Sequence, residues 1–272
     1  MNQTAETAEL KSCCAALYQS DLAHILLGDS FHPGGQRLTG RLGEKLGLRP
    51  GLRVLDVASG KGESAIYIAQ RFGCHVVGVD FGAQNVQESS VRAAAAGVAD
   101  RVSFVEGDAE GLNFPEASFD AVICECAFCT FPQKQVAADE FRRVLRRGGG
   151  IGMSDLTRSA DLPAELEGLL AWIACIADAL PVEEYTNCLA EAGLEVMLVE
   201  QHDGALADMA RDVQTRLLGA ELMVKLKKLD LPGTDFDEAR KMARAALTAT
   251  QQGSLGYSLI VARLRALENG CS

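Results

Sequence analysis

The sequence has few basic residues for its size, and they are not clustered. Its 272 residues include 26 lysines and arginines against 37 aspartates and glutamates, which gives a formal net charge of −11. Nucleic acid is bound by clustered basic groups that neutralise phosphates, so a nucleic-acid substrate is excluded. The sequence also lacks an apolar run as long as a membrane span, so no membrane partner is expected.

The first twelve residues, MNQTAETAELKS, lack the charged-then-apolar pattern of a secretory signal. We therefore expect a cytoplasmic protein, in which the nine cysteines are thiols rather than structural disulfides. Internal repeats are absent as well. With 48% hydrophobic and 23% charged residues, the composition is that of a globular protein able to bury a full core.

The most informative segment that is present reads VLDVASGKG, at Val54–Gly62. An apolar run leads into an aspartate and two glycines, and a helix-like stretch begins at Glu63. A strand, a glycine turn and a helix N-terminus together bring backbone N–H groups against a ligand. The residues of this segment that we expect to contact the ligand are Asp56, Ala58, Ser59, Gly60 and Gly62.

Two further apolar runs end in acidic residues. The run HVVGVD ends in Asp80, whose carboxylate can accept hydrogen bonds from both hydroxyls of an adenosine ribose. The run RVSFVEGD ends in Asp108, which with Ala109 is placed beside an adenine amino group. Phe81 is placed to cover the adenine ring, and Asn85 lies one helical turn further on. The sequence therefore predicts a nucleoside-containing cofactor across the strand tips.

The glycine turn also fits the loose dinucleotide pattern GxGxxA, so NAD is an alternative cofactor. Asp56 argues against it, because a carboxylate there would repel a pyrophosphate but attract the ammonium group of an amino acid. Over about Gly51–Asp155 the chain resembles the class I S-adenosylmethionine-dependent methyltransferases. The matching elements are the DxxxGxG loop, the acidic tip of the second strand, GDAE, FDAVIC and RVLRRGGG. The resemblance implies S-adenosyl-L-methionine as the cofactor.

The expected fold is α/β, with a doubly wound, mainly parallel seven-stranded sheet and a C-terminal helical insertion. We expect N-terminal helices in residues 1–50, a cofactor-binding core in 51–160 and a C-terminal part in 161–272, all in one domain. Helices are predicted at 164–180, 182–192, 206–229 and 235–252, the last two as a cap over the substrate pocket. Strands are predicted at 53–57, 75–79, 102–106, 119–124, 151–156, 195–201 and 256–264.

Three cysteines lie within six residues at the end of the fourth predicted strand, in ICECAFCTF. Cys124, Cys126 and Cys129 are thereby expected at the carboxyl edge of the sheet, where open α/β sheets bind ligands. Two alternatives remain: cysteine is a small hydrophobe that suits buried strands, and CxCxxC can contribute to a zinc site, although no matching pair follows.

A second segment, LLAWIACIADALPVEEYTNCLAEAGLE, carries Cys175. Together with ECAFCTF it resembles the arsenite methyltransferases, in which cysteine thiolates hold trivalent arsenic. The resemblance implies that Cys126 and Cys175 bind and present the arsenic, with a trivalent arsenical as substrate and a thiol reductant as a partner. Many members carry a third cysteine near the position of Ala65, so Cys124 or Cys129 is a candidate replacement.

Soft trivalent arsenic prefers thiolate ligands and keeps a nucleophilic lone pair, so catalysis reduces to alignment and exclusion of water. No histidine or tyrosine has the sequence spacing of a general base, which an oxygen-methylating enzyme usually needs. His32, before Gly34 and Gly35, is placed to close over the amino-acid end of the cofactor. The alternatives are a carbon-, oxygen- or sulfur-methylating enzyme with structural cysteines, and a non-catalytic metalloid sensor.

Overall fold

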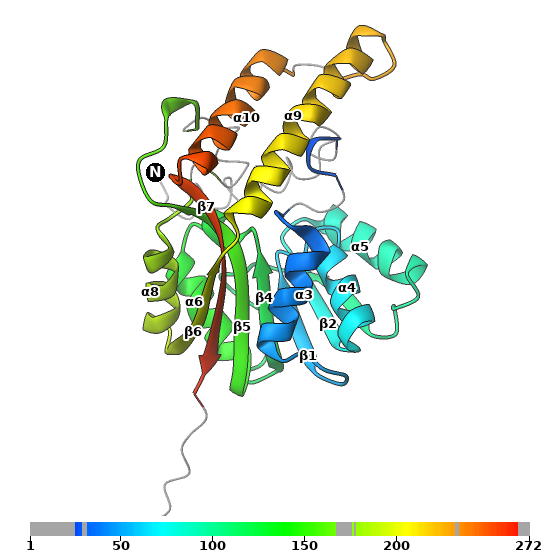
Figure 1. The fold of residues 1–272 in the computed structure, drawn as a ribbon. Coiled ribbons are helices and arrows are strands. Elements are labelled where there is room, and N and C mark those ends of the chain that lie inside the picture. The colour runs from blue at the N-terminus through cyan, green and yellow to red at the C-terminus, as the bar shows by residue number, and fades with distance from the viewer. Residues whose placement is uncertain (1–24, 29–31, 167–175, 177, 232–233, 266–272) are drawn as a thin grey trace, which may run out of the picture.

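The computed structural model describes residues 25–28, 32–166, 176, 178–231 and 234–265, which form a sheet covered by helices on both faces (Figure 1). The strands are β1 (Arg53–Val57), β2 (His75–Asp80), β3 (Val102–Glu106), β4 (Phe119–Glu125), β5 (Leu145–Arg158), β6 (Leu194–Gln201) and β7 (Leu255–Leu264). The α-helices are α3 (Gly35–Leu46), α4 (Glu63–Phe72), α5 (Ala83–Ala95), α6 (Lys134–Val144), α8 (Val182–Glu191), α9 (Asp203–Lys225) and α10 (Phe236–Gln251).

The seven strands form one sheet in the order β3-β2-β1-β4-β5-β7-β6. The pairs from β3 to β5 are parallel, whereas β7 is antiparallel to both of its neighbours. Central strands such as β4 are apolar on both faces, as expected for strands covered by helices, whereas the edge strand β6 alternates half-buried and exposed residues after a buried Leu194. The predicted α/β class with a mainly parallel seven-stranded sheet is confirmed.

Two apolar layers hold the helices against the sheet. One layer packs α3, α4 and α5 through residues such as Leu42 and Ile68. The other packs α6 and α8 through Phe141 and Tyr185, both of which are fully buried. The chain order reverses between β1 and β4, which are neighbours in the sheet, and their carboxyl ends open the crevice in which such folds bind ligands.

Helices α9 and α10 lie between β6 and β7 in sequence and extend side by side beyond the carboxyl edge of the sheet (Figure 1). They pack on each other around Leu217, Ala239 and Ala243. The Asp235 carboxylate caps α10 by accepting from two backbone N–H groups. The predicted helical insertion is therefore present. In the part of the chain that the structure describes, no helix has the length and apolar character needed to cross a membrane.

Of the helix predicted over 164–180, the structure describes 164–166, 176 and 178–180, and none of these residues is α-helical. A 3₁₀ turn occupies Ala164–Leu166, and Leu180 instead pairs with Thr157 of β5. The backbone of Leu180 is held there because the hydroxyl of Tyr185 accepts its N–H at 3.1 Å and its carbonyl accepts from Arg158. Cys175 lies outside the described residues. Strand β5 also begins at Leu145, six residues before the predicted start, directly after α6.

Candidate functional site

A cavity opens at the carboxyl ends of β1, β2 and β4, at the point where the chain order reverses. All the residues predicted to bind the cofactor line this cavity except Gly62. The lining residues among them are Asp56, Ala58, Ser59, Gly60, Asp80, Phe81, Asn85, Asp108 and Ala109. The sheet topology brings them together because each lies at or after the carboxyl end of a strand, and these strands end at the same edge.

The glycine turn after β1 has the conformation that the sequence predicted. Ala58, Gly60 and Gly62 all have a positive φ, of 56°, 51° and 78°. Gly62 is the N-cap of α4 and has a packing role: a Cβ there would lie 2.8 Å from Cε1 of Phe104 and 2.9 Å from Cβ of Ser89. Gly60 has open space around its Cα, on the cavity side of the turn.

Asp80 joins the glycine turn to the tip of β2. Its carboxylate accepts hydrogen bonds from the backbone N–H of Gly60 at 2.7 Å, from that of Gly82 at 2.9 Å and from Asn85 Nδ2 at 3.0 Å. The carboxylate is thereby fixed in position before any ligand binds. Phe81, 39% exposed, stands beside it at the cavity wall, and its contact with an adenine ring stays a prediction.

The cavity contains buried polar atoms that lack a partner. Within the described residues, Asp56 Oδ2, Ser59 Oγ and Glu63 Oε2 have no hydrogen-bond partner, and all three residues line the cavity. Burial, and then the charges of Glu125 and Asp80, raise the pKa of the Asp56 carboxyl well above its ordinary value. Such a group gains from a cationic ligand, and the ammonium and sulfonium of S-adenosylmethionine fit that requirement.

Asp108 and Ala109 line the cavity after β3. The Asp108 carboxylate accepts the N–H of Glu110 at 2.9 Å, and Asp108 forms an isolated bridge with Gly111. This local turn holds the carboxyl group at the cavity wall. Its role in adenine recognition stays a prediction.

The structure separates the three cysteines near the end of β4. Cys126 lines the cavity, whereas Cys124 and Cys129 are fully buried in the apolar core and are absent from the cavity wall. Cys124 belongs to the apolar layer that packs α6 and α8 on the sheet. Its burial, and then the charge of Asp155, raise the pKa of its thiol well above normal. The proposal that Cys124 or Cys129 supplies a reactive thiolate is therefore not supported by their positions. All five cysteines of the described residues are thiols, not disulfides.

Cys126 has an unusual backbone conformation, with φ of 53°. Its N–H donates to the carbonyl of Ser154 on β5 at 2.6 Å. Non-glycine residues in this left-handed region are uncommon and cluster at functional sites. The bend turns the chain out of β4, so that Cys126 reaches the cavity while Cys124 stays in the core.

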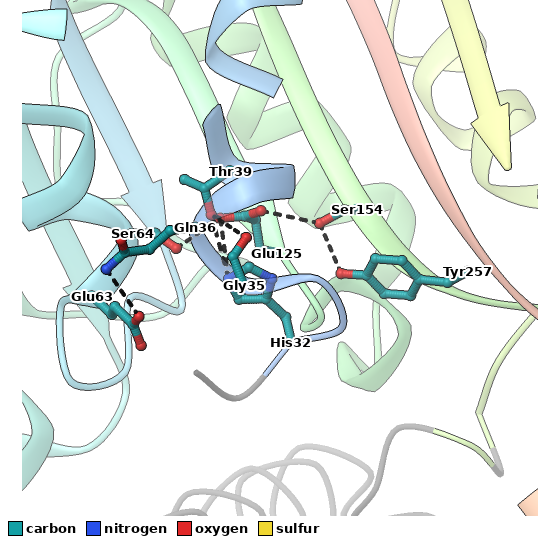
Figure 2. Close-up of polar contacts among 9 residues, drawn as sticks. All are labelled: His32, Gly35, Gln36, Thr39, Glu63, Ser64, Glu125, Ser154 and Tyr257. Atoms are coloured by element: carbon teal, nitrogen blue, oxygen red, sulfur yellow. Dashed lines mark hydrogen bonds and ion pairs between the residues drawn. The ribbon is translucent and has the colours of Figure 1, made fainter. Parts of the chain in front are cut away.

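Glu125, which the sequence reading missed, is the centre of a buried polar network at the same place (Figure 2). Its Oε2 accepts from Thr39 Oγ1 at 2.9 Å and from Ser64 Oγ at 2.7 Å, and lies 3.7 Å from His32 Nε2. Its Oε1 accepts from Ser154 Oγ, to which the hydroxyl of Tyr257 donates. The sequence did contain a signal for Glu125, because this residue ends an apolar strand just as Asp80 does.

Comparison with known proteins identifies the family of the chain. A family model described as a methyltransferase domain matches residues 54–149. The 27-O-demethylrifamycin SV methyltransferase of Amycolatopsis mediterranei is 30% identical over 259 residues, covering 90% of this chain and 93% of that protein. The chain belongs to the S-adenosylmethionine-dependent methyltransferases. The cofactor of this methyltransferase is therefore S-adenosyl-L-methionine, as predicted.

Two further likenesses bear on fold and acceptor. The phosphoethanolamine N-methyltransferase 2 of Haemonchus contortus, solved with S-adenosyl-L-methionine, superposes with a TM-score of 0.78 at 17% identity, over 94% of this chain and 60% of that one. The arsenite methyltransferase of Halobacterium salinarum is 30% identical over 183 residues, which is 64% of this chain and 46% of that protein. The relatives thus act on different acceptors.

Proposed function

We propose that the methyl acceptor is trivalent arsenic held by the thiolates of Cys126 and Cys175. The observation that carries the proposal is the position of Cys126: among the described cysteines it alone lines the cofactor cavity. The sequence motif around Cys175 and the likeness to an arsenite methyltransferase support the choice of acceptor.

The charges in the cavity link binding of S-adenosylmethionine to formation of the thiolate that holds arsenic. Asp56 and Glu125 line the same cavity as Cys126, so their negative charge opposes formation of a thiolate there. When bound, S-adenosylmethionine supplies an electrophilic methyl group on a positively charged sulfur, which offsets that charge. Cys126 and Cys175 then hold the arsenic and orient its lone pair, while Ala127 and Phe131 at the cavity wall exclude water.

The experiment compares Cys126→Ser and Cys175→Ser with the matched control Cys188→Ser, a half-buried cysteine of α8 away from the cavity. Arsenite is titrated into the protein, and the fluorescence of Trp172, the only tryptophan and three residues from Cys175, is followed with and without S-adenosylmethionine. Methylated arsenic products are then measured by mass spectrometry. Saturable quenching and product formation that survive only in the control support the proposal. Normal arsenite methylation by Cys126→Ser refutes it.

A hydroxyl group of a larger organic molecule is the second candidate acceptor. It is favoured by the relative that spans nearly the whole chain and whose name gives 27-O-demethylrifamycin SV as its substrate. In that case Cys126→Ser retains methyl transfer to the hydroxyl substrate, which separates the two candidates.

A further inference from the structure

A second cavity adjoins the cofactor cavity, and His32 is the residue that lines both. The second cavity lies between the segment before α3 and the first half of α9, where Ala205, Met209 and Asp212 contribute to its wall. A molecule in the second cavity would therefore approach the methyl group past His32.

The two ring nitrogens of His32 differ in their surroundings. Nε2 lies 3.4 Å from Thr39 Oγ1 and 3.7 Å from Glu125 Oε2, which is one side of the network in Figure 2. Nδ1 is buried and has no hydrogen-bond partner within the described part of the chain. His32 is only 9% exposed, and the Glu125 side chain is 3% exposed. A buried imidazole with one nitrogen beside a carboxylate and the other unpartnered is the arrangement of an oriented base.

We propose that His32 is the general base for a hydroxyl acceptor whose body occupies the second cavity, with Glu125 as a positioning residue. Nδ1 takes the hydroxyl proton while the oxygen forms a bond to the methyl carbon. The bond from that carbon to the cofactor sulfur breaks, and its electron pair stays on sulfur. The imidazolium that forms is stabilised by the Glu125 carboxylate, which Thr39 and Ser64 hold in place.

This inference rests on the methyltransferase activity, and it is independent of arsenic binding. An arsenic lone pair carries no proton, whereas a hydroxyl acceptor must lose one. The base therefore adds an activity toward protic acceptors that Cys126 and Cys175 do not provide. A failure of arsenite methylation leaves this proposal standing, and a failure of His32 leaves the thiolate proposal standing.

The test uses the full chain with His32→Asn, which keeps a polar side chain of similar reach but removes the base. His75→Asn, at the exposed start of β2, is the matched control. Transfer of a radiolabelled methyl group is measured to phenol and to 4-nitrophenol, which is largely ionised at mildly alkaline pH. A lost general base lowers turnover on phenol by about 100-fold or more, but lowers it by less than about 10-fold on the ionised acceptor. The affinity for S-adenosylhomocysteine, measured by calorimetry, stays within a few-fold of the parent protein.

Three results would overturn the proposal. Equal losses on both phenols mean a structural role, and loss of S-adenosylhomocysteine affinity in His32→Asn means that His32 serves the cofactor instead. Absence of any transfer to phenol by the parent protein also overturns it. Nitrogen-15 spectra of the histidines give an independent readout: His32 is expected with its proton on Nε2, a preference that Glu125→Gln weakens and that a merely structural role for Glu125 would leave unchanged.

Discussion

The two glycines of the turn after β1 are expected to fail in different ways when alanine replaces them. Gly62 has φ of 78°, and a side chain there meets Phe104 and Ser89 at distances that real Cβ atoms do not adopt. Gly60 has φ of 51°, with no atom within 4 Å of an added Cβ. Both substitutions cost left-handed strain of about 1–2 kcal/mol. Only Gly62→Ala adds overpacking, which costs about 1–3 kcal/mol.

Gly62→Ala is therefore expected to lower the free energy of unfolding by about 2–5 kcal/mol, and Gly60→Ala by about 1–2 kcal/mol. For a chain of this length the larger loss corresponds to a drop in Tm of about 5–15 °C. The effect on the cofactor runs the other way. Gly60 lines the cavity, so a methyl group there intrudes on the ligand, whereas Gly62 points away from it.

The assay is urea denaturation of both variants followed by circular dichroism, with calorimetric titration of S-adenosylhomocysteine at a temperature where both are folded. Gly62→Ala should show the larger fall in midpoint, and Gly60→Ala the larger loss of affinity. If Gly60→Ala is the less stable of the two, or if Gly62→Ala unfolds at the parent midpoint, the packing argument is refuted.

Three other predictions concern charged groups. Asp56→Asn should raise the urea midpoint of the ligand-free protein at neutral pH, because burial raises the pKa of this carboxyl and its ionisation then opposes folding. A lowered urea midpoint would contradict this reasoning. The same variant should bind S-adenosylmethionine more weakly, as measured by calorimetry. Asp80→Asn should reduce affinity for the cofactor by 10-fold or more, on the order of the 1.5–3 kcal/mol of a charged hydrogen bond. The change removes the charged acceptor predicted for the ribose and the carboxylate partner of the Gly60 N–H. The hydrogen bond and charge of Arg41 lower the pKa of Glu200 from 4.5 to about 2, so this pair stabilises the fold above pH 4.5 and the contribution is lost as the pH falls toward 2. In Arg41→Met, the free energy of unfolding measured by denaturation should fall less between pH 4.5 and 2 than in the parent protein. An unchanged pH dependence would show that the pair does not contribute to it.

The convergence of the predicted cofactor residues on one cavity was predictable because each of their signals is local. An apolar run that ends in Asp80 or Asp108 predicts both a strand and the position of the carboxylate, since strand tips meet at one edge. The turn at Gly60 is indicated by its own glycines, although the Asp80 carboxylate also holds it by accepting the N–H of Gly60. Gly62 shows the limit of this reasoning. It packs against Phe104, which lies on a strand more than 40 residues further along the sequence, so the residues around Gly62 do not indicate its packing role.

The acceptor half was predicted less well because it depends on side-chain direction and on distant partners. Cys124 and Cys126 are two residues apart and would share a face in a continuous strand, but β4 ends between them and Cys126 turns into the left-handed region. The sequence pattern shows three cysteines and cannot show that bend. The Glu125 network likewise assembles Thr39, Ser64 and Ser154 from three different elements.

The cofactor side and the acceptor side of the site also differ in how far the family match covers them. The methyltransferase-domain match covers residues 54–149, which include all the predicted cofactor residues and, on the acceptor side, Glu125, Cys126, Ala127 and Phe131. His32 lies before that match, and the α9 wall of the second cavity lies after it. We therefore expect acceptor specificity to depend on His32 and the α9 wall as well as on residues of the matched region. Substitutions that fill the second cavity at Met209, such as Met209→Trp, should then lower turnover on a bulky hydroxyl acceptor without changing S-adenosylhomocysteine affinity, and a parallel loss of both would show that the two cavities are one functional unit.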